Sequence, residues 1–201
     1  MDRVEIKKRA REFASHNKWN FWKPVVILGI IGFIVGIIVG IFGEESVVGS
    51  IISILFEIAI IPYTFGMYAY YLKLVRGKDF STDDLKKYYP MFVRLFLIDL
   101  LAGIFIMLWS ILLVIPGIIA AISYSMIYFI AVDDESLSSS EVLKKSKEMM
   151  NGHKWEYFVF QLSFIGWEIL CTLTCGILLI WIFPYMTAAN VMYYEELKKL
   201  N

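Results

Sequence analysis

Three acidic residues, Glu57, Asp99 and Glu168, stand inside otherwise apolar stretches of this sequence. A carboxyl group at membrane depth is energetically costly and normally faces the interior of a helical bundle, where it can bind an ion or carry a proton. The same groups can instead serve packing alone, through hydrogen bonds across helices that are each worth about 1 kcal/mol or less. The acids therefore indicate either a protonatable interior or a structural polar core.

Other polar side chains occur at helical spacing near one of these acids. Gln161, Glu168, Thr172 and Cys175 are separated by seven, four and three residues, which places them on one helix face. Similar groups occur elsewhere: Ser123, Tyr124, Ser125 and Tyr128, and Thr187, Asn190 and Tyr194. We predict a polar interior made by Glu57, Asp99, Gln161, Glu168, Thr172 and Asn190.

The sequence carries no motif typical of an enzyme active site. His16 and His153 are the two histidines, and they lack the spacing of metal ligands; zinc-protease, serine-hydrolase, thiol-redox and phosphate-loop motifs are absent as well. Cys171 and Cys175 lie one helical turn apart, which favours small core residues over a disulfide. We therefore predict no catalytic activity, no cofactor and no metal, while an intramembrane site built from separated acids stays open as an alternative.

Composition and charge placement indicate the elements that carry these residues. The chain has 201 residues, 59% of them hydrophobic, and a mean hydropathy of +0.65, whereas soluble domains are about half apolar. Lys and Arg are missing from 24–72, 95–143 and 155–197, and each gap holds two apolar runs near the length of a membrane span. We predict an all-α polytopic membrane protein with six transmembrane helices: 24–43, 47–72, 91–115, 117–132, 156–175 and 177–195.

The distribution of basic residues predicts the orientation of these helices. All 19 Lys and Arg residues fall in segments on one side of the predicted spans, and basic loops stay in the cytoplasm. Both termini are therefore expected to be cytoplasmic, with Pro116-Gly117 at an external turn. Basic residues held at a membrane surface also argue against nucleic-acid binding.

Amphipathic cytoplasmic helices are predicted to precede the spans. Residues 1–23 place Ile6, Ala10 and Ala14 on one face and basic residues on the other, which is typical of an interfacial helix on anionic inner-leaflet lipid; a protein-binding role is the alternative. The predicted membrane-surface residues are Lys7, Lys8, Arg11, Trp19, Trp22, Lys86, Lys87, Lys144, Lys145, His153 and Trp155.

Local start and stop signals suggest that the same unit occurs three times. Ser81 with Asp84, and Ser138 with Glu141, are spaced as capping boxes that begin further surface helices, and Gly152 is placed to end the second of them. We interpret the chain as a possible triplicated unit of surface helix, outward span and returning span.

One face of the first span carries only small residues: Gly29, Gly32, Gly36, Gly40 and Gly43. Glycines at spacings of three and four allow two helices to approach closely. The pattern predicts internal packing against a neighbouring span or, as the alternative, a homodimer seam.

Several short motifs occur in a recognisable order: IPGI at 115–118, YSM at 124–126, MMNGHKW at 149–155, LSFIGW at 162–167 and PY at 184–185. In these motifs the chain resembles a bacterial integral-membrane family, the domain of unknown function 975. The resemblance implies a membrane fold with no settled reaction or substrate.

The function predicted from these observations is that of an accessory or scaffold protein without catalysis in the bacterial cytoplasmic membrane, in an export, immunity or envelope context. Its partners would be anionic lipids and a second copy or another membrane protein. The alternative is a small transporter or channel with a protonatable interior.

Overall fold

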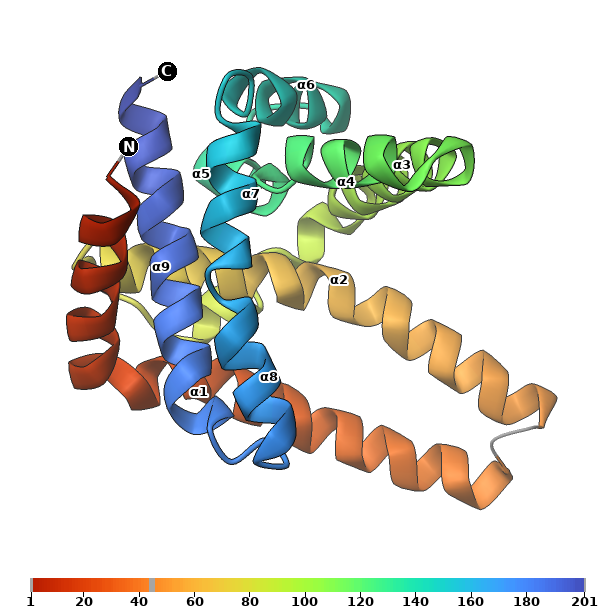
Figure 1. The fold of residues 1–201 in the computed structure, drawn as a ribbon. Helices are drawn as coiled ribbons and strands as arrows, with labels where there is room; N and C mark the ends of the chain where they lie inside the picture. The colour runs from red at the N-terminus through yellow and green to blue at the C-terminus, as the bar shows by residue number, and fades with distance from the viewer. Residues whose placement is uncertain (1, 44–45, 201) are drawn as a thin grey trace.

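The regular elements of this computed structural model, which describes residues 2–43 and 46–200, are all helical (Figure 1). The α-helices are α1 (Arg3–Phe42), α2 (Val47–Val75), α3 (Phe92–Leu112), α4 (Val114–Ser123), α5 (Ile127–Asp133), α6 (Ser139–Met149), α7 (Lys154–Leu162), α8 (Ile165–Leu173) and α9 (Leu179–Leu200). Two short 3-10 helices, η1 (Thr82–Leu85) and η2 (Tyr89–Met91), lie between α2 and α3. The predicted all-α class is confirmed.

Helix α1 is continuous through the predicted boundary between the surface helix 1–23 and the first span. Its kink lies at Asn17, where φ is −113° and ψ is 16°, and the Asn17 amide donates to the Phe13 carbonyl at 3.1 Å. Asparagine side chains compete with the backbone in this way and disturb a helix. Pro24 stays inside the helix, and its carbonyl accepts the Tyr63 hydroxyl at 2.7 Å. The boundary therefore belongs at Asn17.

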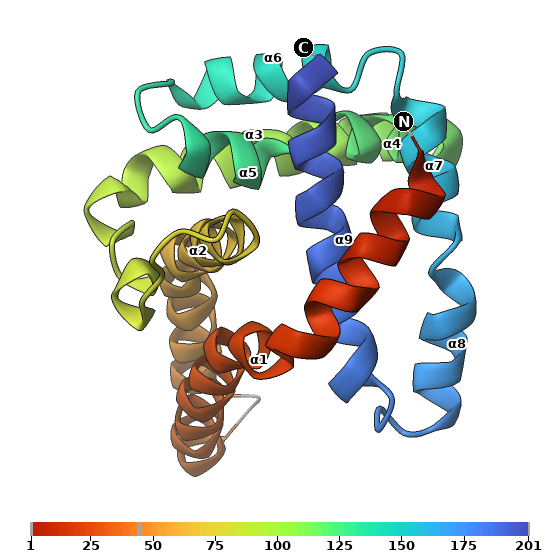
Figure 2. The same cartoon turned by 90° about the vertical axis from the view of Figure 1, so that its left-hand side faces the viewer.

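The first half of α1 lies along α9 of the same chain (Figure 2). Ile6, Ala10 and Ala14 form the apolar face that the sequence predicted, and all three are buried. Arg9 pairs with Glu196 at 3.1 Å and fixes the two helices together. The protein thus covers the face that we expected lipid to cover.

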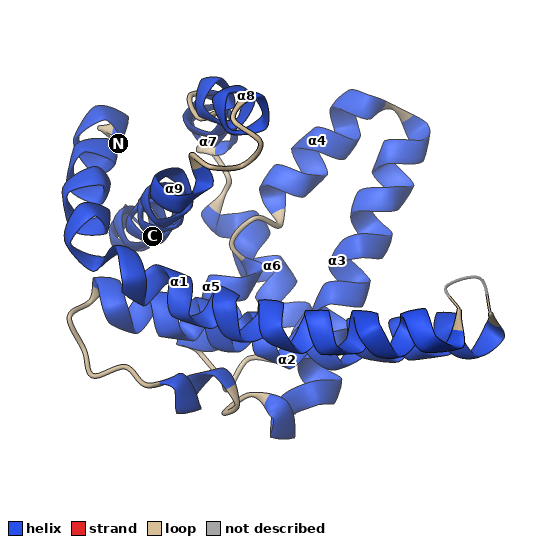
Figure 3. Ribbon diagram, turned by 90° about the horizontal axis from the view of Figure 1, so that it is seen from below, coloured by secondary structure: helices blue, strands red, loops and turns tan. Residues whose placement is uncertain are grey.

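Three helical hairpins extend from a shared region: the second half of α1 with α2, α3 with α4, and α8 with α9. The hairpins point in different directions and do not form one parallel bundle (Figures 1 and 3). Among the described residues, four segments are long and apolar enough to cross a membrane: Arg3–Phe42, Val47–Val75, Thr82–Leu112 and Val114–Asp133. The structure does not confirm six spans.

The predicted span 156–175 is interrupted between α7 and α8. The Ser163 hydroxyl donates to the Phe160 carbonyl and accepts the Lys7 ammonium at 2.8 Å, while Phe164 is fully buried. A side chain that bonds the preceding turn weakens the helix at that point. The last predicted span, 177–195, begins two residues before α9 and otherwise lies within it, but neither segment is among the four candidate spans.

The reversal between α3 and α4 lies at Leu113, whose φ of −161° and ψ of 146° are extended, and not at Pro116-Gly117. Pro116 occupies the first turn of α4, where a missing backbone N–H has no cost. Gly117 packs so closely on Ser110 that a Cβ added at Gly117 would stand 2.8 Å from the Ser110 Cα. The predicted turn at Pro116-Gly117 was therefore wrong, because the chain reverses at Leu113, before Pro116.

The two predicted capping boxes are both present, but only one begins an α-helix. Ser81 and Asp84 cap the four-residue η1, whereas Ser138 and Glu141 cap α6. Gly152 follows α6 with a φ of +81°, as predicted for a left-handed residue. Since the second surface helix is reduced to 3-10 turns, the triplicated unit is not confirmed.

The hairpins meet in a region that we call the base: residues 3–24, 60–76, 126–150, 154–164 and 185–198. Its largest fully buried side chains include Tyr70, Tyr193, Phe21, Phe65, Phe160 and Phe164. Gly66 is required there, because a Cβ would stand 2.6 Å from the Leu85 carbonyl oxygen. The apolar ends of the hairpins, residues 26–43, 46–55, 104–119 and 165–181, are the tips, and many of their large side chains are exposed.

The glycine face of the first span is open within the chain. A Cβ at Gly29, Gly36 or Gly40 would meet nothing within 4 Å, and one at Gly32 would meet only Phe56 at 3.9 Å. The internal-packing interpretation therefore does not hold, because α2 does not approach these glycines closely.

Candidate functional site

The base holds a cluster of charged and polar groups contributed by α2, α5 and α9. Arg76 pairs with Asp133 at 2.7 Å and with Glu195 at 2.6 Å. The Tyr194 hydroxyl donates to Asp133 at 3.0 Å, and Lys198 pairs with the same carboxylate oxygen. We call these five residues the base ion cluster. Hydrogen bonding to Asp133, and then to Glu195, raises the pKa of Arg76 above its ordinary value although burial opposes the shift.

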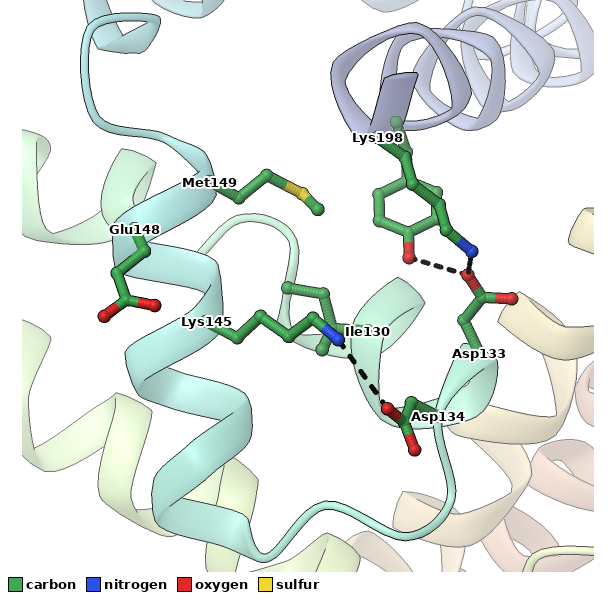
Figure 4. Close-up of a pocket in the computed structure, with 8 residues that line it drawn as sticks. Ile130, Asp133, Asp134, Lys145, Glu148, Met149 and Lys198 are labelled. Atoms are coloured by element: carbon green, nitrogen blue, oxygen red, sulfur yellow. Dashed lines mark hydrogen bonds and ion pairs between the residues drawn. The ribbon is translucent and has the colours of Figure 1, made fainter. Parts of the chain in front are cut away.

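A cleft of about 490 Å³ opens beside this cluster, between α5, α6 and α9 (Figure 4). Its lining residues are Ile130, Asp133, Asp134, Lys145, Glu148, Met149, Tyr194 and Lys198. Lys145 lies 3.6 Å from Asp134, so both lysines of the cleft face carboxylates. Because the charges neutralise one another, the cleft is better suited to joining helices than to binding a charged ligand.

The structure brings together two of the predicted interior residues, Gln161 of α7 and Asn190 of α9. The Gln161 amide nitrogen donates to the Asn190 side-chain oxygen at 3.1 Å and to the Tyr157 hydroxyl at 2.6 Å. Tyr157 in turn donates to Asn190 at 3.2 Å. Sequence reasoning missed Tyr157, although its position four residues before Gln161 places both on one helix face.

Asp99 is half-buried on α3, and its carboxyl group interacts electrostatically with the Tyr128 hydroxyl. Tyr128 stacks on Tyr68 of α2 with ring centroids 4.7 Å apart. Arg94, the nearest cation along the sequence, has other partners: its guanidinium donates to the carbonyls of Leu137 at 2.6 Å and Asp134 at 3.1 Å. Asp99 therefore has a neutral hydroxyl as partner in place of an opposite charge.

The other predicted acids do not join this group. Glu57 and Glu168 are both exposed. Glu168 lines a shallow cleft with Thr172 of the same helix, and neither Glu57 nor Asp99 contributes to that cleft. Thr172 uses its hydroxyl to bond the Glu168 carbonyl at 3.0 Å. The three acids thus do not share one cavity, as the intramembrane-enzyme alternative would require.

The predicted membrane-surface residues mostly make contacts within the protein. Lys87 pairs with Glu135 at 2.5 Å, Lys144 lies 3.9 Å from Glu148, and His153 lies 3.3 Å from Glu156. Six others are exposed in the structure: Lys8, Arg11, Trp19, Lys86, Lys145 and Trp155. The Trp22 indole donates to the Ile180 carbonyl at 3.1 Å, which fixes α1 to α9.

Metal-ligating and thiol side chains are spread apart in the described residues. In the described part of the chain, no group of three or more His, Cys, Asp or Glu side chains is placed to hold a metal ion. Both cysteines are free thiols, with Cys171 buried and Cys175 exposed. What the site does offer is a set of polar contacts that join helices from all three hairpins.

The regular elements of the described residues are all helical, and four helical segments are long and apolar enough to cross a membrane, which is typical of a helical membrane protein. The sequence matches the family model described as "Protein of unknown function (DUF975)" over residues 1–123 and 111–201. The two segments together cover the whole chain, which therefore belongs to the DUF975 family. No curated protein and no solved structure matches it.

Proposed function

We propose that the protein is a multi-pass protein of the bacterial cytoplasmic membrane that acts without catalysis, as a scaffold or accessory for another membrane protein or a second copy. The observation that carries this proposal is the contrast between a cross-linked base and three diverging hairpins with exposed apolar side chains. Exposed apolar surface of this extent marks a membrane or protein interface.

The same proposal includes the topology predicted from the sequence. The basic residues support cytoplasmic placement of both termini, by the positive-inside rule. Six membrane passages would require the α7–α8 and α9 segments to enter the bilayer beside the four candidate spans. The three hairpins support descent from a triplicated unit whose second surface helix has shortened to η1.

The partner of the scaffold would bind along the first hairpin. Its glycine face is open within the chain, and small residues allow close approach of a helix from a second copy or another membrane protein. Export, peptide immunity and envelope maintenance are the settings in which such an accessory would act.

A direct test compares cross-linking with flux. A photo-cross-linking residue at Gly36 should give a defined adduct in membranes, while one at the buried Phe65 should give none. Liposomes containing the purified protein should show no ion or proton flux above protein-free liposomes. A measurable flux together with no adduct would overturn the scaffold proposal.

A small proton-linked transporter is the second candidate, favoured by the half-buried Asp99, whose carboxyl group is near the Tyr128 hydroxyl. This alternative requires that Asp99→Asn abolish a flux that the wild-type protein shows. Glu57→Gln is the matched control, because Glu57 is exposed and should leave the flux unchanged.

A further inference from the structure

A second cleft, of about 480 Å³, lies between the first half of α1 and the α8–α9 hairpin. Figure 2 shows this half of α1 crossing α9, with α8 beside them. Arg11, Ser15 and Lys18 line the cleft from α1, and Trp167, Trp181 and Tyr185 line it from the hairpin. Unlike the cleft of Figure 4, it has no acidic residue in its lining.

The basic side of this cleft follows directly from helix geometry. Arg11, Ser15 and Lys18 are spaced four and three residues apart, so all three lie on one face of α1. Lys7, one turn before Arg11, lies on the same face and is held by Ser163 at 2.8 Å and over the Phe164 ring at 4.7 Å. The face is thereby fixed toward the hairpin.

Neither cation of the cleft is neutralised by a carboxylate in the described structure. Lys18 instead lies 5.0 Å from the centre of the Trp181 ring, and Arg11 lines the cleft together with Tyr185. Aromatic rings hold a cation without cancelling its charge. Two positive charges therefore remain available to an anion that enters the cleft.

The other wall of the cleft is apolar. Ala14 and Ile182 form a buried floor, and Leu178 extends the apolar wall. Trp167 and Trp181 are 37% and 54% exposed, so indole rings stand at its opening. Tryptophan is typical of the level of the lipid headgroups. The cleft thus combines an anion-binding end with an apolar end.

We propose that this cleft binds one anionic phospholipid, with its phosphate at Arg11, Ser15 and Lys18 and an acyl chain against Leu178 and Ile182. The proposal rests on the membrane location proposed above. It differs from general attraction to the inner leaflet, because the apolar face of α1 is already buried against α9, and this cleft offers a basic end and an apolar end side by side.

The test uses the full-length protein purified in detergent, with dioleoyl phosphatidylglycerol as the probe and native mass spectrometry as the measurement. The wild type should retain one phosphatidylglycerol molecule. Arg11→Gln with Lys18→Gln should weaken retention about 30-fold, because each basic residue near the headgroups contributes roughly fivefold. Lys8→Gln with Lys23→Gln removes the same charge from exposed positions of α1 and should leave retention unchanged.

Three outcomes would overturn the lipid site: equal losses in both double variants, no loss in the cleft variant, or equal competition by glycerol phosphate without acyl chains. A measurement without variants uses phosphatidylglycerol with a photoreactive acyl chain, which should label residues 178–182. Labelling confined to the α1–α2 tip would contradict the proposal. Extraction of the protein from membranes by alkaline carbonate would instead contradict the proposed membrane function, so the two failures are distinguishable.

Discussion

The base and the tips of this molecule are both rich in apolar side chains, but their neighbours differ. In the base, Tyr70 and Phe65 are almost completely buried among other helices of the chain. In the tips, Phe33 and Ile41 are 72% and 77% exposed. The glycines of the two regions differ in the same way. A Cβ added at Gly66 would meet the Leu85 backbone, whereas one added at Gly36 would meet nothing within 4 Å. Contacts within the chain thus bury the base but leave many large apolar side chains of the tips exposed.

The largest effect is expected from breaking the base ion cluster. Arg76→Gln would leave Asp133 and Glu195 partly buried without their shared cation, and we expect a loss of about 3 kcal/mol in the free energy of unfolding. Thermal unfolding in detergent, followed by circular dichroism, measures this loss. Lys144→Gln is the control, since its pair with Glu148 is exposed and should contribute less than about 1 kcal/mol. Equal losses would show that the base has no special role.

The second comparison replaces one glycine by alanine in the base and one in the tips, and compares the stability of the two variants. Gly66→Ala would place a Cβ 2.6 Å from the Leu85 carbonyl oxygen and should cost about 2 kcal/mol, because a packed core cannot absorb the overlap. Gly36→Ala meets open space and should leave the unfolding temperature unchanged. If Gly36→Ala proved equally destabilising, the first hairpin would have to be packed as tightly as the base.

The polar contacts of α7 and α9 give a smaller expected effect. Tyr157→Phe removes the hydroxyl that binds both Gln161 and Asn190, and we expect a loss of about 1 kcal/mol in the free energy of unfolding. Tyr89→Phe, at a position 45% exposed, is the control. A loss confined to the control would refute a stabilising role for this contact.

The smallest expected effect is a pH dependence of the stability that Glu141 contributes at the start of α6. The Glu141 carboxylate accepts hydrogen bonds from the Ser138 hydroxyl at 2.6 Å and from its backbone N–H at 2.8 Å, which hold the pKa of Glu141 below its ordinary value. Because the folded pKa is depressed, this contribution is present above the unfolded pKa of about 4.3 and is lost as the pH falls through the folded value.

The unfolding temperatures of the wild type and Glu141→Gln should therefore differ at pH 7 and converge in acid. Glu148→Gln, on the exposed face of the same helix, is the control and should show a smaller difference at pH 7. A wild-type advantage that is undiminished at pH 3 would be inconsistent with the depressed pKa.

Local features of the fold could be predicted because they depend on neighbours within a few residues. Ser138 with Glu141 forms the predicted capping box, and Gly152 takes the predicted positive φ. The break at Ser163 could not be predicted in this way, since it involves Lys7, a residue 156 positions away. The continuation of α1 through Pro24 could not be predicted from neighbouring residues either, because the Pro24 carbonyl accepts a hydrogen bond from Tyr63 of a different helix.

The sequence by itself determined that the chain is helical, that long stretches of it are apolar, and where several helices begin and end. It also identified Glu57, Asp99 and Glu168 as acidic residues within apolar stretches, because such positions can be read from the sequence alone. Only the tertiary structure decided that Asp99 is half-buried beside Tyr128 while Glu57 and Glu168 are exposed. The reason is physical: exposure and partners depend on how the three hairpins diverge from the base, and that depends on contacts between residues far apart in the chain.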